Sequence, residues 1–198
     1  MQGKIKNILR IVIALIVTSF VAINSYIYAQ ASAKEETVGF TTKEVRVVDG
    51  DTIAITKGNK KWNIRLQGID APESKQTCIN KVDNKVWDCG IESGEALRKE
   101  LALCNVKNKC CVTIIGTDKY GRSIGFVKIG EGKDTIDINQ HMVRSGWAVA
   151  YRQYLTAYVN DEDKAHIEKK GIWSSEFAMP SDFRHAKKKT SKSFKEDL

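Results

Sequence analysis

The sequence predicts an α+β domain in which a small closed β-barrel carries helices on its outside. Short runs of alternating apolar and β-branched residues recur along the chain, separated in several places by glycine or Asp-Gly, as in half-buried strands. The order of elements is strands, helix, strands, helix, helix, which differs from the regular alternation of βαβ folds. With 198 residues, 42% of them apolar and 28% charged, the chain is sufficient for one domain with a modest core and is not disordered overall.

Five strands and three helices are expected from this pattern. The expected strands are residues 45–48, 53–55, 62–66, 112–115 and 124–129, and the expected helices are residues 92–104, 140–146 and 159–170. In the first helix Leu97, Leu101 and Cys104 form one apolar stripe. Asn139 is a suitable N-cap for the second helix, and Gly171 is a suitable C-terminal stop for the third.

The first 33 residues have the pattern of a secretory signal peptide. Three basic residues precede an apolar run at residues 11–23, and two Ala-x-Ala cleavage sites follow at residues 29–33. The apolar run is shorter than the roughly 20 residues of a membrane span. The alternative is an uncleaved membrane anchor at residues 11–28, and in both cases the domain leaves the cytoplasm.

The remaining chain divides into a leader, a domain and a tail. Residues 34–42 are polar, the domain is expected at residues 43–175, and the lysine-rich residues 181–198 are expected to form a mobile tail. Without the three basic residues of the signal peptide, 29 basic and 24 acidic residues leave a net charge of +5. This balance is compatible with a polyanionic partner but does not require one.

All five cysteines follow the signal peptide. In an oxidising compartment they favour disulfides over metal binding. We expect Cys78 to pair with Cys89, and Cys104 to pair with Cys110 or Cys111, so that one cysteine is unassigned. A zinc site is the alternative, but the sequence has no Cys-x-x-Cys pair or nearby histidine to support it.

The segment Asp-Gly-Asp-Thr at residues 49–52 is the first candidate for chemistry. Alone it is most often a turn with solvated carboxylates, but Arg65, Asp70 and Glu73 follow within one further strand and turn. Two acidic turns one strand apart can bring Asp51 and Asp70 together, where their carboxylates repel unless a cation lies between them. Ca²⁺ binds roughly six to eight hard oxygens, and two carboxylates with a neighbouring main-chain carbonyl are a suitable partial set.

The segment Asp-Lys-Tyr-Gly-Arg at residues 118–122 is the second candidate. By itself it is a tight hairpin turn with exposed charges. Together, Arg65 and Arg122 supply two guanidinium groups that match phosphate oxygens. Carboxylates with a divalent cation, a separate glutamate and paired arginines are the groups that phosphodiester hydrolysis requires.

These motifs resemble those of the thermonuclease family, whose type member is staphylococcal nuclease. The matching segments are "DGDTIAI" from residue 49, "RLQGIDAPE" from residue 65 and "DKYGR" from residue 118. Similarity continues through "INQHMVRSGWAVAY" and "KKGIW", so the resemblance spans residues 43–173. It implies an OB-fold barrel of five strands with three helices packed outside. It also implies a monomer that cleaves DNA and RNA with Ca²⁺ and little sequence preference, leaves 3′-phosphate ends, and needs no protein partner. A membrane partner enters only if the signal segment is retained.

The resemblance also implies roles for individual residues. Asp51 and Asp70 would bind Ca²⁺ through their side chains, Ala71 through its carbonyl, and Asp49 through water. Glu73 would be the general base. The phosphate would be held by Arg65 and Arg122. Lys119 and Tyr120 would contact a terminal phosphate, and Tyr151 would stack on a base, with Tyr154 as a second candidate.

Three departures from the family pattern affect these expectations. Ala71 replaces a threonine, which a backbone ligand tolerates. Residues 74–89 form a longer segment than in the type member and directly follow the expected base, so they are candidates for shaping substrate access. The spacing in residues 147–154 also differs, which weakens the assignment of the stacking tyrosines.

A non-catalytic OB-fold module that binds nucleic acid is the alternative function. The acidic and arginine positions are all intact, and a binding module has no physical reason to keep a set of repelling carboxylates. Catalysis is therefore favoured. The three histidines, His141, His166 and His185, are expected on surface helices or in the tail and are assigned no catalytic role.

Overall fold

The computed structural model describes residues 15–20, 35–105 and 109–186 of the chain. It divides into a unit of residues 1–35 and a domain of residues 36–198. Of the expected signal peptide, only residues 15–20 lie within the described ranges, and they are helical. No helix in the described ranges has the length and apolar character needed to cross a membrane.

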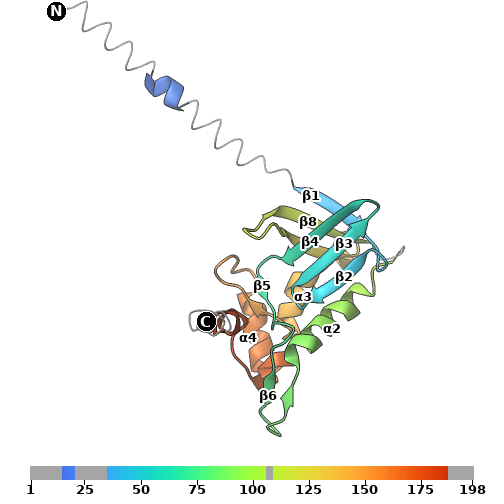
Figure 1. Cartoon of the computed structure of the whole chain (residues 1–198), viewed down its shortest axis with the longest axis vertical. Coiled ribbons are helices and arrows are strands. Elements are labelled where there is room, and N and C mark those ends of the chain that lie inside the picture. The colour runs from blue at the N-terminus through green and yellow to red at the C-terminus, as the bar shows by residue number, and fades with distance from the viewer. Residues whose placement is uncertain (1–14, 21–34, 106–108, 187–198) are drawn as a thin grey trace, which may run out of the picture. The chain divides into compact units, whose positions relative to one another are not determined.

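A curled antiparallel sheet with one parallel pairing forms the main layer of the domain (Figure 1). Its strands follow the order β1-β8-β9-β4-β3-β2, with β10 paired to β9. The bounds are β1 Glu36–Phe40, β2 Val45–Asp49, β3 Thr52–Lys57, β4 Lys60–Leu66, β8 Cys110–Thr117, β9 Ser123–Ile129 and β10 Ile136–Asp137. The parallel pair is β4 with β9, which aligns Ile64 with Ser123. This pairing places Arg65 opposite Ile124, two residues after Arg122.

Two small sheets complete the domain. One pairs β5 (Ile69–Asp70) with β11 (Val149–Ala150), and the other joins β12 (Ser175–Glu176), β6 (Cys78–Asn80) and β7 (Val86–Trp87). Single 3₁₀ turns are η1 (Gly132–Asp134) and η2 (Gly171–Ser174). The α+β class and the OB-fold are confirmed, and all five expected strands are present.

The sheet begins earlier than expected, because the segment interpreted as a polar leader contains β1. This strand pairs with β8, aligning Val38 with Val112 and Phe40 with Cys110. Val38 and Phe40 are buried, while the residues between and before them face solvent. The expected domain start at residue 43 is therefore too late.

Three helices pack on one side of the sheet, as expected: α2 Cys89–Leu101, α3 Ile138–Arg144 and α4 Val159–Ile167 (Figure 1). The α2 helix starts and ends three residues before the expected bounds, and Cys104 lies beyond it. The α4 helix ends at Ile167, and Gly171 instead opens η2 with a positive φ of 51°.

The expected N-cap of α3 is wrong. Asp137 caps the helix, because its carboxylate accepts a hydrogen bond from the backbone N–H of Gln140 at 3.0 Å. Asn139 is buried two residues further along, inside the first turn, where its side chain accepts from Val127 N at 3.1 Å and donates to Gln67 O at 2.9 Å. Asn139 therefore joins the helix to the sheet instead of ending it. The C-terminal stop at Gly146, with φ of 76°, is as expected.

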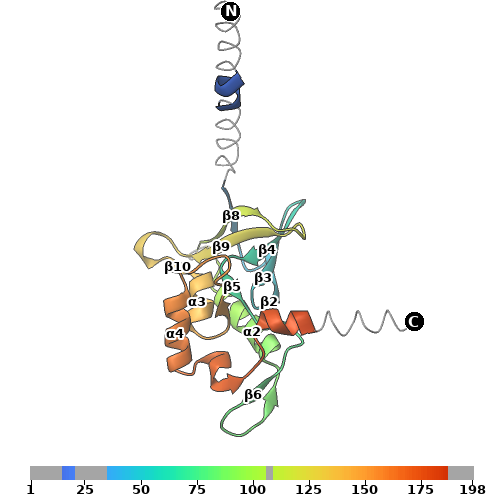
Figure 2. The same cartoon turned by 90° about the vertical axis from the view of Figure 1, so that its left-hand side faces the viewer.

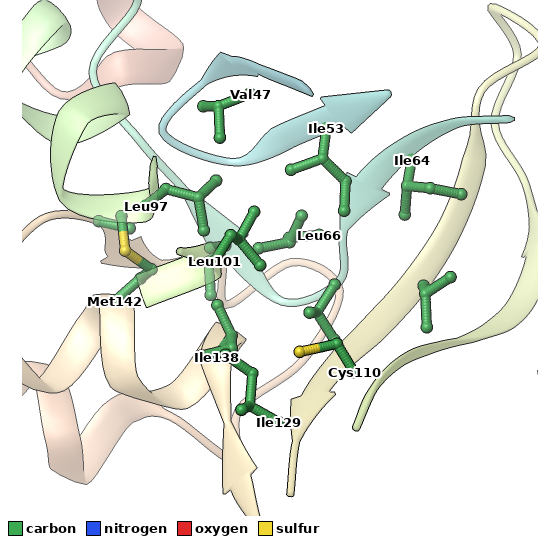
Figure 3. Close-up of a cluster of buried hydrophobic side chains, with 14 of the residues drawn as sticks. Val47, Ile53, Ile64, Leu66, Leu97, Leu101, Cys110, Ile129, Ile138 and Met142 are labelled. Carbon is green, nitrogen blue, oxygen red and sulfur yellow. The ribbon is translucent and has the colours of Figure 1, made fainter. Parts of the chain in front are cut away.

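Figure 3 shows the core where the concave side of the sheet meets the helices. Ile53, Ile64 and Leu66 from the strands face Leu97 of α2 and Met142 of α3, and all are buried. Each such side chain contributes about 1.5–3 kcal/mol when removed from water. The core fixes β3, β4 and α2, the elements that carry or flank the acidic turns.

The long segment that follows Glu73 folds as the β6–β7 hairpin over a second, smaller core. Cys78 and Cys89, bonded to each other, pack there with Val149 and Ile172. The expected Cys78–Cys89 bridge is confirmed, and a loop of this length gives a disulfide worth roughly 3 kcal/mol. Cys104 pairs with Cys110, and Cys111 is the free cysteine of the described residues.

The end of the domain differs from the expected mobile tail. Residues 180–186 are α-helical, and residues 187–198 lie outside the described ranges. Of the three histidines, His141 and His166 lie on α3 and α4 as expected, and His185 lies in this terminal helix.

Candidate active site

The Asp-Gly-Asp segment is the turn between β2 and β3, where the strand register shifts. Asp49 Oδ1 accepts a hydrogen bond from Asp51 N at 3.1 Å, which turns the chain sharply. Only glycine fits between the two aspartates: a Cβ at Gly50 would lie 1.9 Å from Ser93 Oγ and 2.7 Å from Ala71 Cβ. The turn is therefore packed against α2 and against the segment after β5, and the carboxylate of Asp51 points inward, 1% exposed.

Asp51 and Asp70 meet at the guanidinium of Arg65. Arg65, on β4, forms an ion pair with Asp51 through Nη1 and with Asp70 Oδ1 through Nη2 at 2.6 Å. The other oxygen of Asp51 accepts from the backbone N–H of Ala71 at 2.7 Å. Asp70, like Asp51, is only 1% exposed. The two acidic turns are thus adjacent in space, in the arrangement that the sequence suggested.

Burial governs the charges in this cluster. It raises the pKa of Asp49, and the positive charge of Arg65 opposes that shift. Burial likewise lowers the pKa of Arg65, while the Asp70 carboxylate acts in the opposite direction. A guanidinium titrates so far above neutrality that Arg65 keeps its charge. The site therefore concentrates negative charge in a poorly solvated place.

Glu73 lies in a turn after β5, and hydrogen bonds to the Glu73 backbone fix this turn. Gln76 N donates to Glu73 O at 2.7 Å, and Glu73 N donates to Gln76 Oε1 at 3.3 Å. The start of α2 presses on the same carbonyl, since a Cβ at Gly90 would lie 1.8 Å from Glu73 O. The backbone is therefore held while the Glu73 side chain, 35% exposed, reaches solvent beside Asp70.

Arg122 ends the turn between β8 and β9. Asp118 organises this turn by accepting from the backbone N–H groups of Tyr120 and Arg122 and from Arg122 Nε, at 2.8, 2.9 and 2.8 Å. The side chain of Arg122 therefore contacts Asp118 and not the carboxylates of the site. Its charge nonetheless acts there: it opposes the burial that raises the pKa of Asp49, and it adds to the burial that lowers the pKa of Arg65.

The expected substrate contacts lie around these groups without touching the acidic cluster. Lys119 Nζ is 5.3 Å from the ring centre of Tyr120, which is largely exposed. Tyr151 follows β11, whose Val149 pairs with Asp70, and its ring packs edge-on against that of Tyr154 at 4.9 Å. The structure thus places a partly exposed and an exposed tyrosine directly after the strand that pairs with Asp70.

Arg184 is the site residue that the sequence analysis missed. From the terminal helix it contacts Asp70 through Nη1 and Nη2 at 2.9 and 3.0 Å, and Glu73 Oε1 through Nη1 at 2.9 Å. It is separated from these partners by 114 and 111 residues. The only local signal was an arginine in a polar segment, which is common in solvated tails.

The donors at this site suit a hard divalent cation. Asp51 and Asp70 converge on one point from neighbouring elements, and four carboxylates, those of Asp49, Asp51, Asp70 and Glu73, surround two arginines. All of the donors are oxygens, the preference of Ca²⁺ and Mg²⁺. Among the described residues, no group of three or more histidine, cysteine or acidic side chains is arranged to hold a metal ion by itself. A cation bound by Asp51 and Asp70 would therefore have few protein ligands, with positions left for water and substrate.

The comparison with known families agrees with this arrangement. Residues 63–175 match the family described as staphylococcal nuclease homologue, which is more than half of the chain. The chain belongs to the staphylococcal nuclease homologue family. Membership in this family makes the chain a nuclease-type hydrolase, and the match includes Arg65, Asp70, Glu73 and Arg122.

Individual relatives extend over more of the chain. An uncharacterized endonuclease of Escherichia coli O157:H7 is 37% identical over 138 residues, which is 69% of this chain and 78% of the relative. A micrococcal nuclease of Shigella flexneri is 32% identical over 159 residues, covering 75% and 83%. A thermonuclease of Staphylococcus hyicus is 31% identical over 140 residues, covering 68% and 76%.

Proposed function

We propose that this protein is an exported, Ca²⁺-dependent nuclease that hydrolyses phosphodiester bonds of DNA and RNA with little sequence preference and leaves 3′-phosphate ends. The observation that carries the proposal is the convergence of Asp51 and Asp70 on Arg65, with Glu73 beside Asp70. The names of the relatives, a thermonuclease and a micrococcal nuclease among them, support the same substrate class.

Asp51 and Asp70 would hold the cation through their carboxylates, and Ala71 would add its backbone carbonyl. Asp49 would act through water, because its carboxylate already bonds the Asp51 backbone. A bound divalent cation would supply Lewis-acid polarisation of a phosphate oxygen. All three protein ligands lie on two backbone segments fixed by the core, so the positions of the ligands are set before the cation arrives.

Glu73 would accept a proton from the attacking water as general base. Its side chain reaches solvent while its backbone is fixed by Gln76 and Gly90, which suits a group that must reach a water molecule at a defined position. The proton goes to the carboxylate, and the water oxygen forms the new bond to phosphorus as the bond to the leaving 5′ oxygen breaks.

Arg65 and Arg122 would bind the phosphate oxygens and stabilise the charge that develops on them. The five N–H donors of Arg65 exceed the three protein contacts described for its guanidinium, which are with Asp51, Asp70 and Ile69 O. Arg122 would exchange Asp118 for phosphate, a move that its partial exposure allows. Lys119 and Tyr120 would contact a terminal phosphate, and Tyr151 would stack on a base.

Export is supported by the two disulfides, because such bonds persist in oxidising compartments. The signal-peptide pattern of residues 1–33 supports the same conclusion. We expect a protein released by signal cleavage, with a membrane-tethered form as the alternative. We further propose that the protein acts as a monomer on nucleic acid, without a protein partner.

The end chemistry of the products tests the proposal. Single-stranded DNA cut by the protein should fail to prime a polymerase until a phosphatase removes the 3′-phosphate. Ends that are extended at once would show 3′-hydroxyl products and would contradict the proposed direction of cleavage. A protein that binds the strand but never cuts it with any divalent ion would instead be the non-catalytic binding module.

A further inference from the structure

The terminal helix brings a cation of the protein's own into the active site. Arg184 makes a parallel, two-pronged contact with Asp70 and bridges to Glu73, as described above. Figure 2 shows the segment that carries it as the red helix near the end of the chain. One guanidinium therefore joins the proposed metal ligand to the proposed base.

The segment before this helix is attached to the same turn. Buried Gln76, which fixes the Glu73 backbone, donates its side-chain N–H to Ala178 O at 2.6 Å. This bond holds the chain two residues before the helix begins. The helix itself is short, and Arg184 is 31% exposed on it. The hydrogen bond between Gln76 and Ala178 thus fixes the chain just before the helix, while the Arg184 contact itself is open to water.

The contact uses the oxygens that a metal ion would need. Asp70 Oδ1 accepts from Arg65 Nη2 and Arg184 Nη1, and Asp70 Oδ2 accepts from Arg184 Nη2. A carboxylate oxygen has two lone pairs in the carboxylate plane, so Oδ1 is fully occupied. Glu73 is engaged in the same way, because its Oε1 accepts a hydrogen bond from Arg184 Nη1.

We propose that Arg184 is an intramolecular latch that occupies Asp70 and Glu73 in the metal-free protein and leaves when a divalent cation binds. The inference rests on the proposed function, since it assumes that Asp70 is a metal ligand. Arg184 and the cation compete for the same carboxylate, and the doubly charged ion wins when its concentration is high enough. The apparent affinity for the cation is then the intrinsic affinity multiplied by the fraction of molecules in which the latch is open.

The latch keeps an exported nuclease less active where free calcium is scarce. Release of the terminal helix also frees Glu73 to contact water, so cation binding and activation of the base are coupled. Arg65 differs from Arg184 in this respect, because its side chain is only 15% exposed and both of its carboxylate partners, Asp51 and Asp70, are buried.

Calorimetric titration of the oxidised full chain with calcium chloride tests the latch without relying on activity. We expect Arg184→Gln to bind calcium about tenfold more tightly than wild type, which corresponds to a latch closed in about nine molecules of ten. Arg144→Gln is the matched control: Arg144 pairs with Asp161 on α4, so it removes an equal charge elsewhere. The control should bind calcium as wild type does, and circular dichroism should show all three proteins folded.

Limited chymotrypsin digestion gives a second readout. Cleavage at Phe183 in wild type should be slow without calcium and faster with it, whereas Arg184→Gln should be cut rapidly in both conditions. Equal calcium affinity of wild type and Arg184→Gln would overturn the latch and leave the metal site intact. Weaker binding by Arg184→Gln would also overturn it and would make Arg184 a supporting residue of the site. If none of the three proteins binds calcium, the metal site is wrong and the latch with it.

Discussion

Replacing Glu73 by glutamine should lower kcat for cleavage of single-stranded DNA by about 10²–10⁴-fold, the range over which a positioned general base contributes. Glutamine keeps the size of the side chain and a hydrogen bond to Arg184 but cannot take a proton from water. Because the backbone of Glu73 is fixed by Gln76 and by the start of α2, the substitution should leave the fold unchanged. Steady-state kinetics at saturating substrate measures the effect.

Glu131→Gln is the matched control for this experiment. Glu131 is an exposed residue whose carboxylate pairs with Lys109, away from the acidic cluster. The Glu131→Gln protein should cleave DNA at the wild-type rate. A Glu73→Gln protein that keeps more than a tenth of the wild-type kcat would remove Glu73 from the role of base.

Asp70→Asn should weaken calcium binding by at least about 100-fold, since the site has few protein ligands and loses one of its two charged ones. The same change should destabilise the metal-free protein by roughly 1–3 kcal/mol, because three charge-assisted hydrogen bonds lose their acceptor charge. Calorimetry measures the affinity, and urea denaturation without metal measures the free energy of unfolding.

The control for Asp70→Asn is Asp163→Asn, a change at an exposed position of α4. It should alter neither the calcium affinity nor the unfolding free energy. Calcium binding by Asp70→Asn at wild-type strength would show that the cation is held elsewhere and would sever the proposed function from the Asp51–Asp70 cluster.

The central part of the fold could be predicted because its pattern is local. The five expected strands are short runs rich in apolar and β-branched residues, with clear alternation at residues 62–66, and α2 carries its apolar stripe at helical spacing. The β1 strand obeys the same rule, since Val38 and Phe40 alternate with exposed neighbours, but its charged surroundings led to its interpretation as a leader. The alternating pattern of β1 was therefore present in the sequence, but the charged residues around it favoured a solvated leader.

The capping of α3 shows a different limit. Asp137 and Asn139 are both good N-cap residues, and local preference alone cannot choose between them. The choice depends on β9 and Gln67, which supply partners for the Asn139 amide from distant parts of the chain. Arg184 illustrates the same limit more strongly, because an ion pair across 114 residues leaves no mark on the local sequence.

The acidic motifs are the opposite case. Asp51 and Asp70 are separated by two paired strands, so their proximity follows from the hairpin geometry of β3 and β4. The sequence could not show how Arg122 would point, and its contact with Asp118 is a property of the tight turn that they share. The positions of the site residues were thus more predictable than the partners of their side chains.

The most direct measurement is the rate of single-stranded DNA cleavage by the oxidised protein as free calcium is raised from chelated to millimolar levels. We expect no cleavage in excess chelator, a rate that rises and saturates with calcium, and full recovery when calcium is added back to the chelated sample. Cleavage at an undiminished rate in chelator, or strand binding without cleavage at any calcium concentration, would contradict a calcium-dependent nuclease built on Asp51, Asp70 and Glu73.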